Sequence, residues 1–195
     1  MKRIVFLISH VGSDSDKLLQ ILNEKPRVQI VDKGGYYDHP KDLDHFSTQS
    51  HKMDGTAAIY GDHLLHNANF SCEALHSIGK FIYLIREAKP SLNENSVHPR
   101  RSVENYYRFR LRRIYEMASK TPGAVFLTWD DIRTGKGFPL IEDYLGLKEP
   151  LIAREDLFPK SIKDHYPFDL VERCQDAYEK YLYRLRNLKL SQVSP

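Results

Sequence analysis

Short apolar runs recur along the chain, and several are rich in β-branched residues. A continuous run of this kind is typical of a parallel strand that is buried on both faces. The first run, Ile4–Ile8, is the most apolar and is expected to be a central strand. Further strands are predicted at residues 28–31, 81–85 and 124–128.

Between these runs, apolar residues recur at helical spacing. Leu18, Leu19, Ile21 and Leu22 predict a helix from about Asp16. Further helices are predicted at residues 102–119, 139–144 and 169–190. Strands that alternate with helices predict a three-layer α/β fold with a mainly parallel central sheet flanked by helices. A length of 195 residues favours a single domain over 1–195, with a C-terminal helix at about 169–190.

Composition narrows the class of protein. A formal charge of +3, with 41% hydrophobic and 28% charged residues, is that of an ordinary globular protein and argues against a dedicated nucleic-acid binder. Cys72 and Cys174 form no CxxC unit, so neither a disulfide framework nor a zinc site is indicated. The sequence has no signal-peptide core and no apolar stretch of membrane-spanning length. A cytoplasmic protein without a membrane partner is therefore expected, and its oligomeric state is left open.

The turn after the first strand is a candidate phosphate-binding loop. In α/β folds, anions bind where a strand end, a loop and a helix N-terminus meet. A Walker A loop, GxxxxGK[ST], would need a second glycine and a hydroxyl residue that this chain lacks, which disfavours a conventional ATP or GTP hydrolase. A polar turn that binds nothing is the alternative. The candidate ligands are His10, Val11, Gly12, Ser13, Asp14, Ser15 and Lys17.

Arginines provide the second candidate anion site. Arg86 ends the strand in FIYLIREAKPSL, and its planar guanidinium suits a phosphate; the alternative is an ion pair with a carboxylate at the sheet edge. A second group of six arginines lies between residues 100 and 113. These arginines could hold a phosphate of a bound donor, attract an acidic acceptor or form a solvated helix face. Tyr106 and Tyr107 lie among these arginines, which raises RNA binding as a competing hypothesis, but no RNA-binding signature accompanies them. The group consists of Arg100, Arg101, Arg108, Arg110, Arg112 and Arg113.

These motifs together resemble those of the P-loop sulfotransferases, in particular a small bacterial-type member with a divergent 5′-phosphosulfate loop. His10-Val11-Gly12-Ser13 followed by Lys17-Leu18-Leu19 resembles that loop, and FIYLIREAKPSL resembles the strand end that holds the 3′-phosphate. Residues 127–132, 140–147 and 169–190 resemble further family segments.

The resemblance implies 3′-phosphoadenosine 5′-phosphosulfate as co-substrate, with no metal expected. His10 to Ser15 and Lys17 would hold the 5′-phosphosulfate. Arg86 and Ser91 would hold the 3′-phosphate, with Arg100 and Arg101 as further candidates.

A histidine is the candidate catalytic base, because its unperturbed pKa lies near neutral pH. His63, in Tyr60-Gly61-Asp62-His63, is the first candidate, and Lys17 is the second catalytic candidate. His66, His45 and His51 are alternatives for the base. A metal site of Asp62, His63 and His66 is disfavoured, since adjacent residues project differently from a helix.

The sequence thus favours transfer of a sulfuryl group to a hydroxyl or amine on a small-molecule, saccharide or peptide acceptor. A nucleotide or small-molecule kinase on the same scaffold is one alternative. A catalytically silent nucleotide- or polyanion-binding protein is the other.

Overall fold

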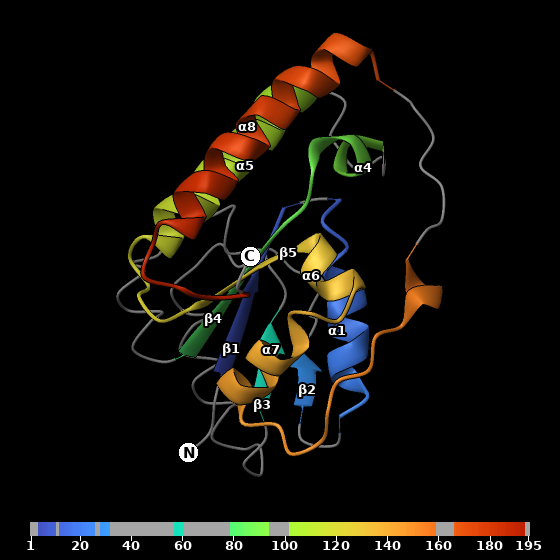
Figure 1. Ribbon diagram of the computed structural model, residues 1–195, viewed down its shortest axis with the longest axis vertical. Coiled ribbons are helices and arrows are strands. Elements are labelled where there is room, and N and C mark those ends of the chain that lie inside the picture. The colour runs from blue at the N-terminus through green and yellow to red at the C-terminus, as the bar shows by residue number, and fades with distance from the viewer. Residues whose placement is uncertain are drawn as a thin grey trace.

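The computed structural model describes residues 4–10, 12–25, 28–31, 57–60, 79–93, 102–158 and 166–193. Within these residues, six strands form one sheet in the order β2-β3-β1-β4-β5-β6, and every neighbouring pair is parallel (Figure 1). The strands are β1 (Ile4–Ile8), β2 (Val28–Val31), β3 (Ala57–Tyr60), β4 (Gly79–Ile85), β5 (Val125–Thr128) and β6 (Ser191–Gln192).

Helices cover both faces of this sheet. They are α1 (Ser15–Asn23), α4 (Ala88–Asn93), α5 (Val103–Ala118), α6 (Trp129–Arg133), α7 (Phe138–Leu145) and α8 (Phe168–Arg186), and a 3₁₀ turn, η2 (Glu155–Leu157), precedes the last of them. No helix in the described part of the chain is long and apolar enough to cross a lipid bilayer.

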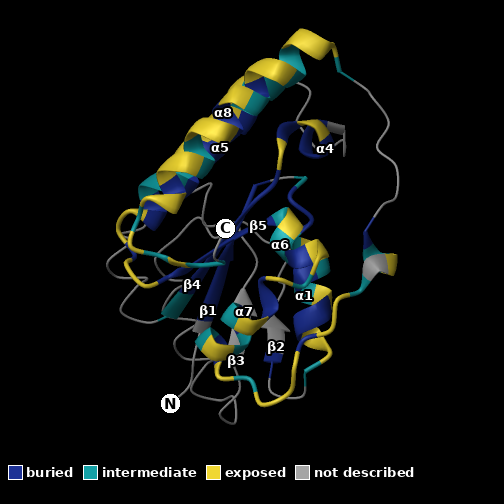
Figure 2. Cartoon of the chain, in the orientation of Figure 1, coloured by how far each residue is buried: buried dark blue, intermediate teal, exposed yellow. Residues whose placement is uncertain are grey.

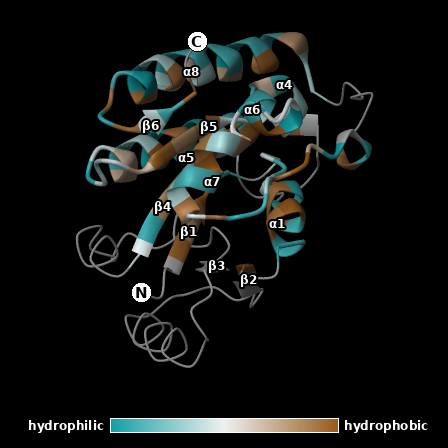
Figure 3. Cartoon of the chain, turned by 60° about the horizontal axis from the view of Figure 1, so that its bottom comes forward, coloured by the Kyte–Doolittle hydropathy of each residue, from teal (hydrophilic) through white to brown (hydrophobic). Residues whose placement is uncertain are grey.

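The alternation of side chains along β1 divides the core into two layers. Val5 and Leu7 face α1 and α7, whereas Phe6 and Ile8 face α5 and α8. Figure 2 shows the buried strands between helices whose outward sides are exposed, and Figure 3 shows hydrophobic strands beneath the largely hydrophilic outer side of α8. The predicted three-layer α/β fold with a mainly parallel sheet flanked by helices is confirmed.

The connections place a topological switch point beside β1. After β1 the chain enters α1 on one face of the sheet, and after β4 it enters α4 and α5 on the other face. β1 and β4 are neighbouring strands, so their carboxyl ends flank the point where the winding changes direction. Open α/β sheets bind their ligands at this point.

Four elements were not predicted from the sequence: β3, α4, α6 and β6. Trp129-Asp130-Asp131, directly after the strand predicted at 124–128, begins helix α6 with a reciprocal cap between Thr128 and Asp131. The start of α1 has no such side-chain cap. Asp14 is its N-cap residue, but the carboxylate of Asp14 makes no capping hydrogen bond.

Candidate functional site

The loop between β1 and α1 is held in a conformation that requires glycine. Gly12 has φ of +76°, and a Cβ at this position would stand 3.0 Å from the carbonyl carbon of Ser91 and closer still to its oxygen. Only a residue without a side chain allows the loop to pass so near the backbone of α4. The loop is therefore fixed against α4 at the carboxyl end of the sheet.

The start of α1 offers backbone N–H donors to a ligand. The N–H of Ser13 donates to the His10 carbonyl over 3.1 Å and that of Lys17 to the Asp14 carbonyl over 2.9 Å, so these two are satisfied. The first N–H groups of a helix lack an intrahelical acceptor, which leaves those of Ser15 and Asp16 as the candidate donors. The Ser13 hydroxyl is also buried, and no partner for it lies within the described part of the chain. Such a combination of amide donors, hydroxyl and helix dipole favours an anion.

Arg86 follows β4 directly, as predicted, and is 1% exposed. Its Nη1 lies 3.0 Å from Oδ2 of Asp14 and donates to the Gly12 carbonyl over 3.0 Å. The guanidinium also lies over the ring of Trp129, 4.5 Å from its centroid. The Trp129 indole N–H donates to the same carboxylate oxygen of Asp14 over 2.8 Å.

The alternative considered for Arg86, an ion pair with a nearby carboxylate, is therefore what the structure contains. The pair joins the candidate loop to the end of β4 and offsets the negative charge that Asp14 brings to the anion site. The 3′-phosphate role of Arg86 stays a prediction.

His10 and Tyr107 fix the backbone around Arg86. The Arg86 N–H donates to Nε2 of His10 over 2.9 Å, and the Tyr107 hydroxyl donates to the Arg86 carbonyl over 2.6 Å. An Nε2 that accepts a hydrogen bond carries no proton, so His10 is neutral here and acts as a structural acceptor. Burial raises the pKa of Tyr107 well above its ordinary value, which keeps this hydroxyl a donor.

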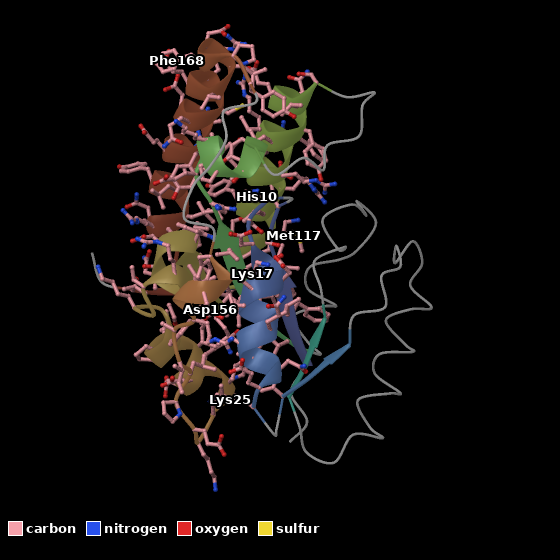
Figure 4. All side chains as sticks on the ribbon, turned by 90° about the vertical axis from the view of Figure 1, so that its right-hand side faces the viewer. His10, Lys17, Lys25, Met117, Asp156 and Phe168 are labelled. Atoms are coloured by element: carbon pink, nitrogen blue, oxygen red, sulfur yellow. The ribbon has the colours of Figure 1, made fainter. Side chains whose placement is uncertain are left out.

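Lys17 and Ser91, two further predicted ligands, lie close to the loop. Lys17 stands in the first turn of α1, where its Nζ is 3.1 Å from Oδ2 of Asp16 (Figure 4). The Ser91 hydroxyl is turned into α4 and donates to the carbonyl of Glu87 over 2.6 Å. Ser15 is the first residue of α1.

Other predicted site residues lie outside the described residues: Val11, His63, Arg100 and Arg101, together with the alternative bases His45, His51 and His66 and the candidate metal ligand Asp62. Among the described residues, no group of three or more His, Cys, Asp or Glu could hold a metal ion.

Trp129 belongs to this site but was not predicted from the sequence. Trp129 directly follows β5, so it lies at the same edge of the sheet as Gly12 and Arg86. Its position after the strand was the available signal, but an indole carries no charge that would have marked it as a partner of Asp14.

Comparisons with known proteins address the fold. No protein-family model matches the sequence, and no curated protein matches it. The structure is similar to the crystal structure of a sulfotransferase from Alicyclobacillus acidocaldarius, with a TM-score of 0.58 and 11% sequence identity over 97% of this chain and 96% of that chain. A de novo designed P-loop protein, 14% identical over 94% of this chain and 96% of that chain, gives a TM-score of only 0.35, which is too low to indicate a shared fold. The chain thus has a sulfotransferase-like α/β fold.

Proposed function

We propose that this chain is a sulfotransferase that transfers a sulfuryl group from 3′-phosphoadenosine 5′-phosphosulfate to a hydroxyl or amine acceptor. The observation that carries the proposal is the loop between β1 and α1, where Ser13 has a buried hydroxyl without a partner in the described part of the chain. The fold supports the proposal, because the similarity to a bacterial sulfotransferase extends over 97% of the chain.

In this proposal the loop binds the 5′-phosphosulfate. The amide N–H groups at the start of α1 and the hydroxyl of Ser13 donate to its oxygens, and Lys17 stabilises the negative charge of the leaving phosphate. For Arg86 to hold the 3′-phosphate, that phosphate must displace the carboxylate of Asp14 or share the guanidinium with it. Arg100, Arg101 and Ser91 are further proposed contacts.

The reaction is a single displacement at sulfur. The acceptor oxygen or nitrogen forms a bond to sulfur, the bond between sulfur and the 5′-phosphate oxygen breaks, and 3′-phosphoadenosine 5′-phosphate leaves. His63 is proposed to take the acceptor proton. Positioning and charge stabilisation supply most of the rate in such a mechanism, so no metal is required.

Ser13→Ala is the sharpest test of the loop. Because no described partner accepts or donates to this hydroxyl, its removal should leave the melting temperature nearly unchanged. We expect affinity for 3′-phosphoadenosine 5′-phosphate, measured by calorimetry, to fall by about tenfold, the loss of a hydrogen bond to a charged group. Ser119→Ala, at the far end of α5, is the matched control. Equal affinity of both variants and the unchanged protein would remove Ser13 from the site.

Lys17→Met tests the proposed leaving-group contact, with Lys25→Met as its control. Figure 4 shows Lys17 near the start of α1 and Lys25 beyond the end of the same helix, so the two variants lose the same charge at opposite ends. Turnover should fall in Lys17→Met and persist in Lys25→Met.

His63→Ala should lose turnover and keep binding of 3′-phosphoadenosine 5′-phosphate. If His63→Ala turns over normally, the base must be sought elsewhere.

The alternatives give different results in one binding screen. Binding of 3′-phosphoadenosine 5′-phosphate without magnesium supports the sulfotransferase. Magnesium-dependent binding of ATP in its place would support a kinase on the same scaffold. Donor binding without turnover on a broad acceptor panel would support a catalytically silent binding protein.

A further inference from the structure

A groove separate from the candidate loop runs between α5 and α8. These helices lie side by side on one face of the sheet (Figure 1), and the groove between them has a volume of about 480 Å³. We refer to it as the α5–α8 groove. Four cations and two aromatic rings dominate its lining: Arg108, Arg112, Arg173, Lys180, Phe109 and Tyr181.

The arginines of the groove are exposed and only weakly committed to protein carboxylates. The side chains of Arg108, Arg112 and Arg173 are 55%, 66% and 49% exposed. Arg112 pairs with Glu116, and Arg173 pairs with Asp169 and shares Glu104, whose side chain is 17% exposed, with Arg108. An ion pair with an exposed arginine contributes at most about 1 kcal/mol. A ligand that carries several negative charges can therefore recruit these guanidinium groups at small cost.

Lys180 adds a further positive charge to the lining of the groove. It makes no ion pair with any residue that the structure describes, and Asp176 is the one acidic side chain in the lining. The lining therefore holds four cationic side chains and one carboxylate, while Glu104, Glu116 and Asp169 outside it pair with the three arginines. An anionic ligand would bind Lys180 directly and compete with these carboxylates for the arginines.

Aromatic rings give the groove a second property. Phe109 is 51% exposed among these charges, and the ring of Tyr181 lines the same groove. A flat apolar ring surrounded by donors suits a ligand with an apolar face and polar edges, as a pyranose ring has. The carboxylate of Asp176 can accept hydrogen bonds from sugar hydroxyls.

The tyrosines that suggested RNA binding do not serve that purpose. Tyr107 is 3% exposed and faces the core, so it cannot stack on a base. The ring of Tyr106 lies 4.9 Å from the guanidinium of Arg110, which is itself buried. Neither tyrosine of this pair is therefore a free stacking platform for a base, and Phe109 is the exposed aromatic ring of α5 in the groove.

We propose that the α5–α8 groove binds oligosaccharides that carry sulfate or carboxylate groups, with the arginines and Lys180 on the anionic groups and Phe109 against a sugar face. The proposal goes beyond the sulfuryl-transfer reaction and does not depend on it, because it concerns binding in the absence of donor. The groove and the candidate loop are nevertheless connected. Gln175, which precedes Asp176 on α8, accepts a hydrogen bond from the N–H of Ala88, two residues after Arg86.

The experiment compares two double charge reversals in the full chain. Arg112→Glu with Lys180→Glu changes the groove, and Lys136→Glu with Lys148→Glu makes the same change of net charge at exposed positions flanking α7, on the other face of the sheet. Binding of a heparin-derived octasaccharide is measured by calorimetry without donor. We expect the groove variant to lose about tenfold or more in affinity and the control to lose less than threefold. The gap between the two variants corresponds to the loss of roughly one charge contact with the ligand.

Phe109→Ala separates the aromatic contact from charge. Its ring is half exposed, so the substitution should leave folding intact, as circular dichroism can verify. We expect a several-fold loss of octasaccharide affinity with net charge unchanged. Equal loss in the two charge-reversal variants would overturn the proposal, as would unchanged octasaccharide affinity in Phe109→Ala.

An oligothymidylate of the same charge is the competing ligand. Binding as tight as that of the octasaccharide at the same ionic strength would replace the saccharide with a general polyanion. The affinity for 3′-phosphoadenosine 5′-phosphate is measured on the same variants and should not change. Failure of the groove proposal is thereby distinguished from failure of the proposed sulfotransferase function.

Discussion

Replacing Asp14 with Asn removes one charge from the buried Asp14–Arg86 pair and leaves the shape of the side chain almost unchanged. Asn tolerates the left-handed backbone conformation that Asp14 adopts, with φ of 57°, so the substitution adds no backbone strain. Its amide oxygen can still accept the hydrogen bond from Trp129. The variant therefore isolates the effect of charge.

The size of the effect follows from burial. The side chains of Arg86 and Asp14 are 1% and 5% exposed, and 3.0 Å separates Nη1 from Oδ2. Removing one partner of a buried ion pair typically costs about 3–5 kcal/mol. For a chain of this size, that loss lowers the melting temperature by roughly 6–20 °C.

Urea unfolding of three variants tests this reasoning. Asp14→Asn should lose about 3–5 kcal/mol of unfolding free energy. Asp130→Asn, in the exposed pair with Arg133, should lose at most about 1 kcal/mol. Asp14→Asn combined with Arg86→Met should cost less than the sum of the two single changes, because no charge is left unpaired. A loss below about 1 kcal/mol in Asp14→Asn would refute the claim that the pair is buried and charged.

Three further predictions concern the loop, a helix start and alkaline pH. Gly12→Ala should destabilise the chain by more than about 1 kcal/mol in thermal unfolding, because its Cβ would collide with the Ser91 carbonyl at positive φ; a melting temperature equal to that of the unchanged protein would contradict the loop geometry. Thr128→Ala should cost about 1 kcal/mol through loss of its cap with Asp131 at the start of α6, which urea unfolding can measure. Burial raises the pKa of Cys174 from 9.0 to about 11, so the native state retains a proton that the unfolded state loses. Stability should therefore fall as pH rises from 9 to 11, by up to about 1.4 kcal/mol per pH unit for this group, and Cys174→Ala should show a shallower fall in urea titrations.

The main elements of the fold were predictable because their patterns are local. The apolar run at Ile4–Ile8 gave the central strand, and the apolar stripe of residues 102–119 gave α5, found at Val103–Ala118. β3, at Ala57–Tyr60, was not predicted, since four residues beginning with two alanines carry little strand signal. Parallel pairing with β1 on one side and β2 on the other defines this strand, and such pairing is not visible in local sequence.

The candidate site was predictable in position but not in its internal contacts. Strand ends located Gly12 and Arg86 at one edge of the sheet. Asp14 is the N-cap residue of α1, yet its carboxylate makes no capping hydrogen bond and instead binds Arg86 and the indole of Trp129. These partners are distant along the chain, so only the fold brings them together. The Asp14 side chain thus forms a buried ion pair in place of a helix cap, and the helical pattern of α1 does not predict that pair.

The central position of β1 has a consequence for synthesis on the ribosome. Ile4 in β1 pairs with Ala58 in β3 and with Gly79 in β4, which emerge much later from the ribosome. At typical synthesis rates of about 5–20 residues per second, β4 is synthesised roughly 4–15 seconds after β1, and the two strands cannot pair before then. Until then, the edge of this apolar strand that pairs with β4 has no partner strand. It is thus a natural binding site for chaperones that recognise extended hydrophobic segments.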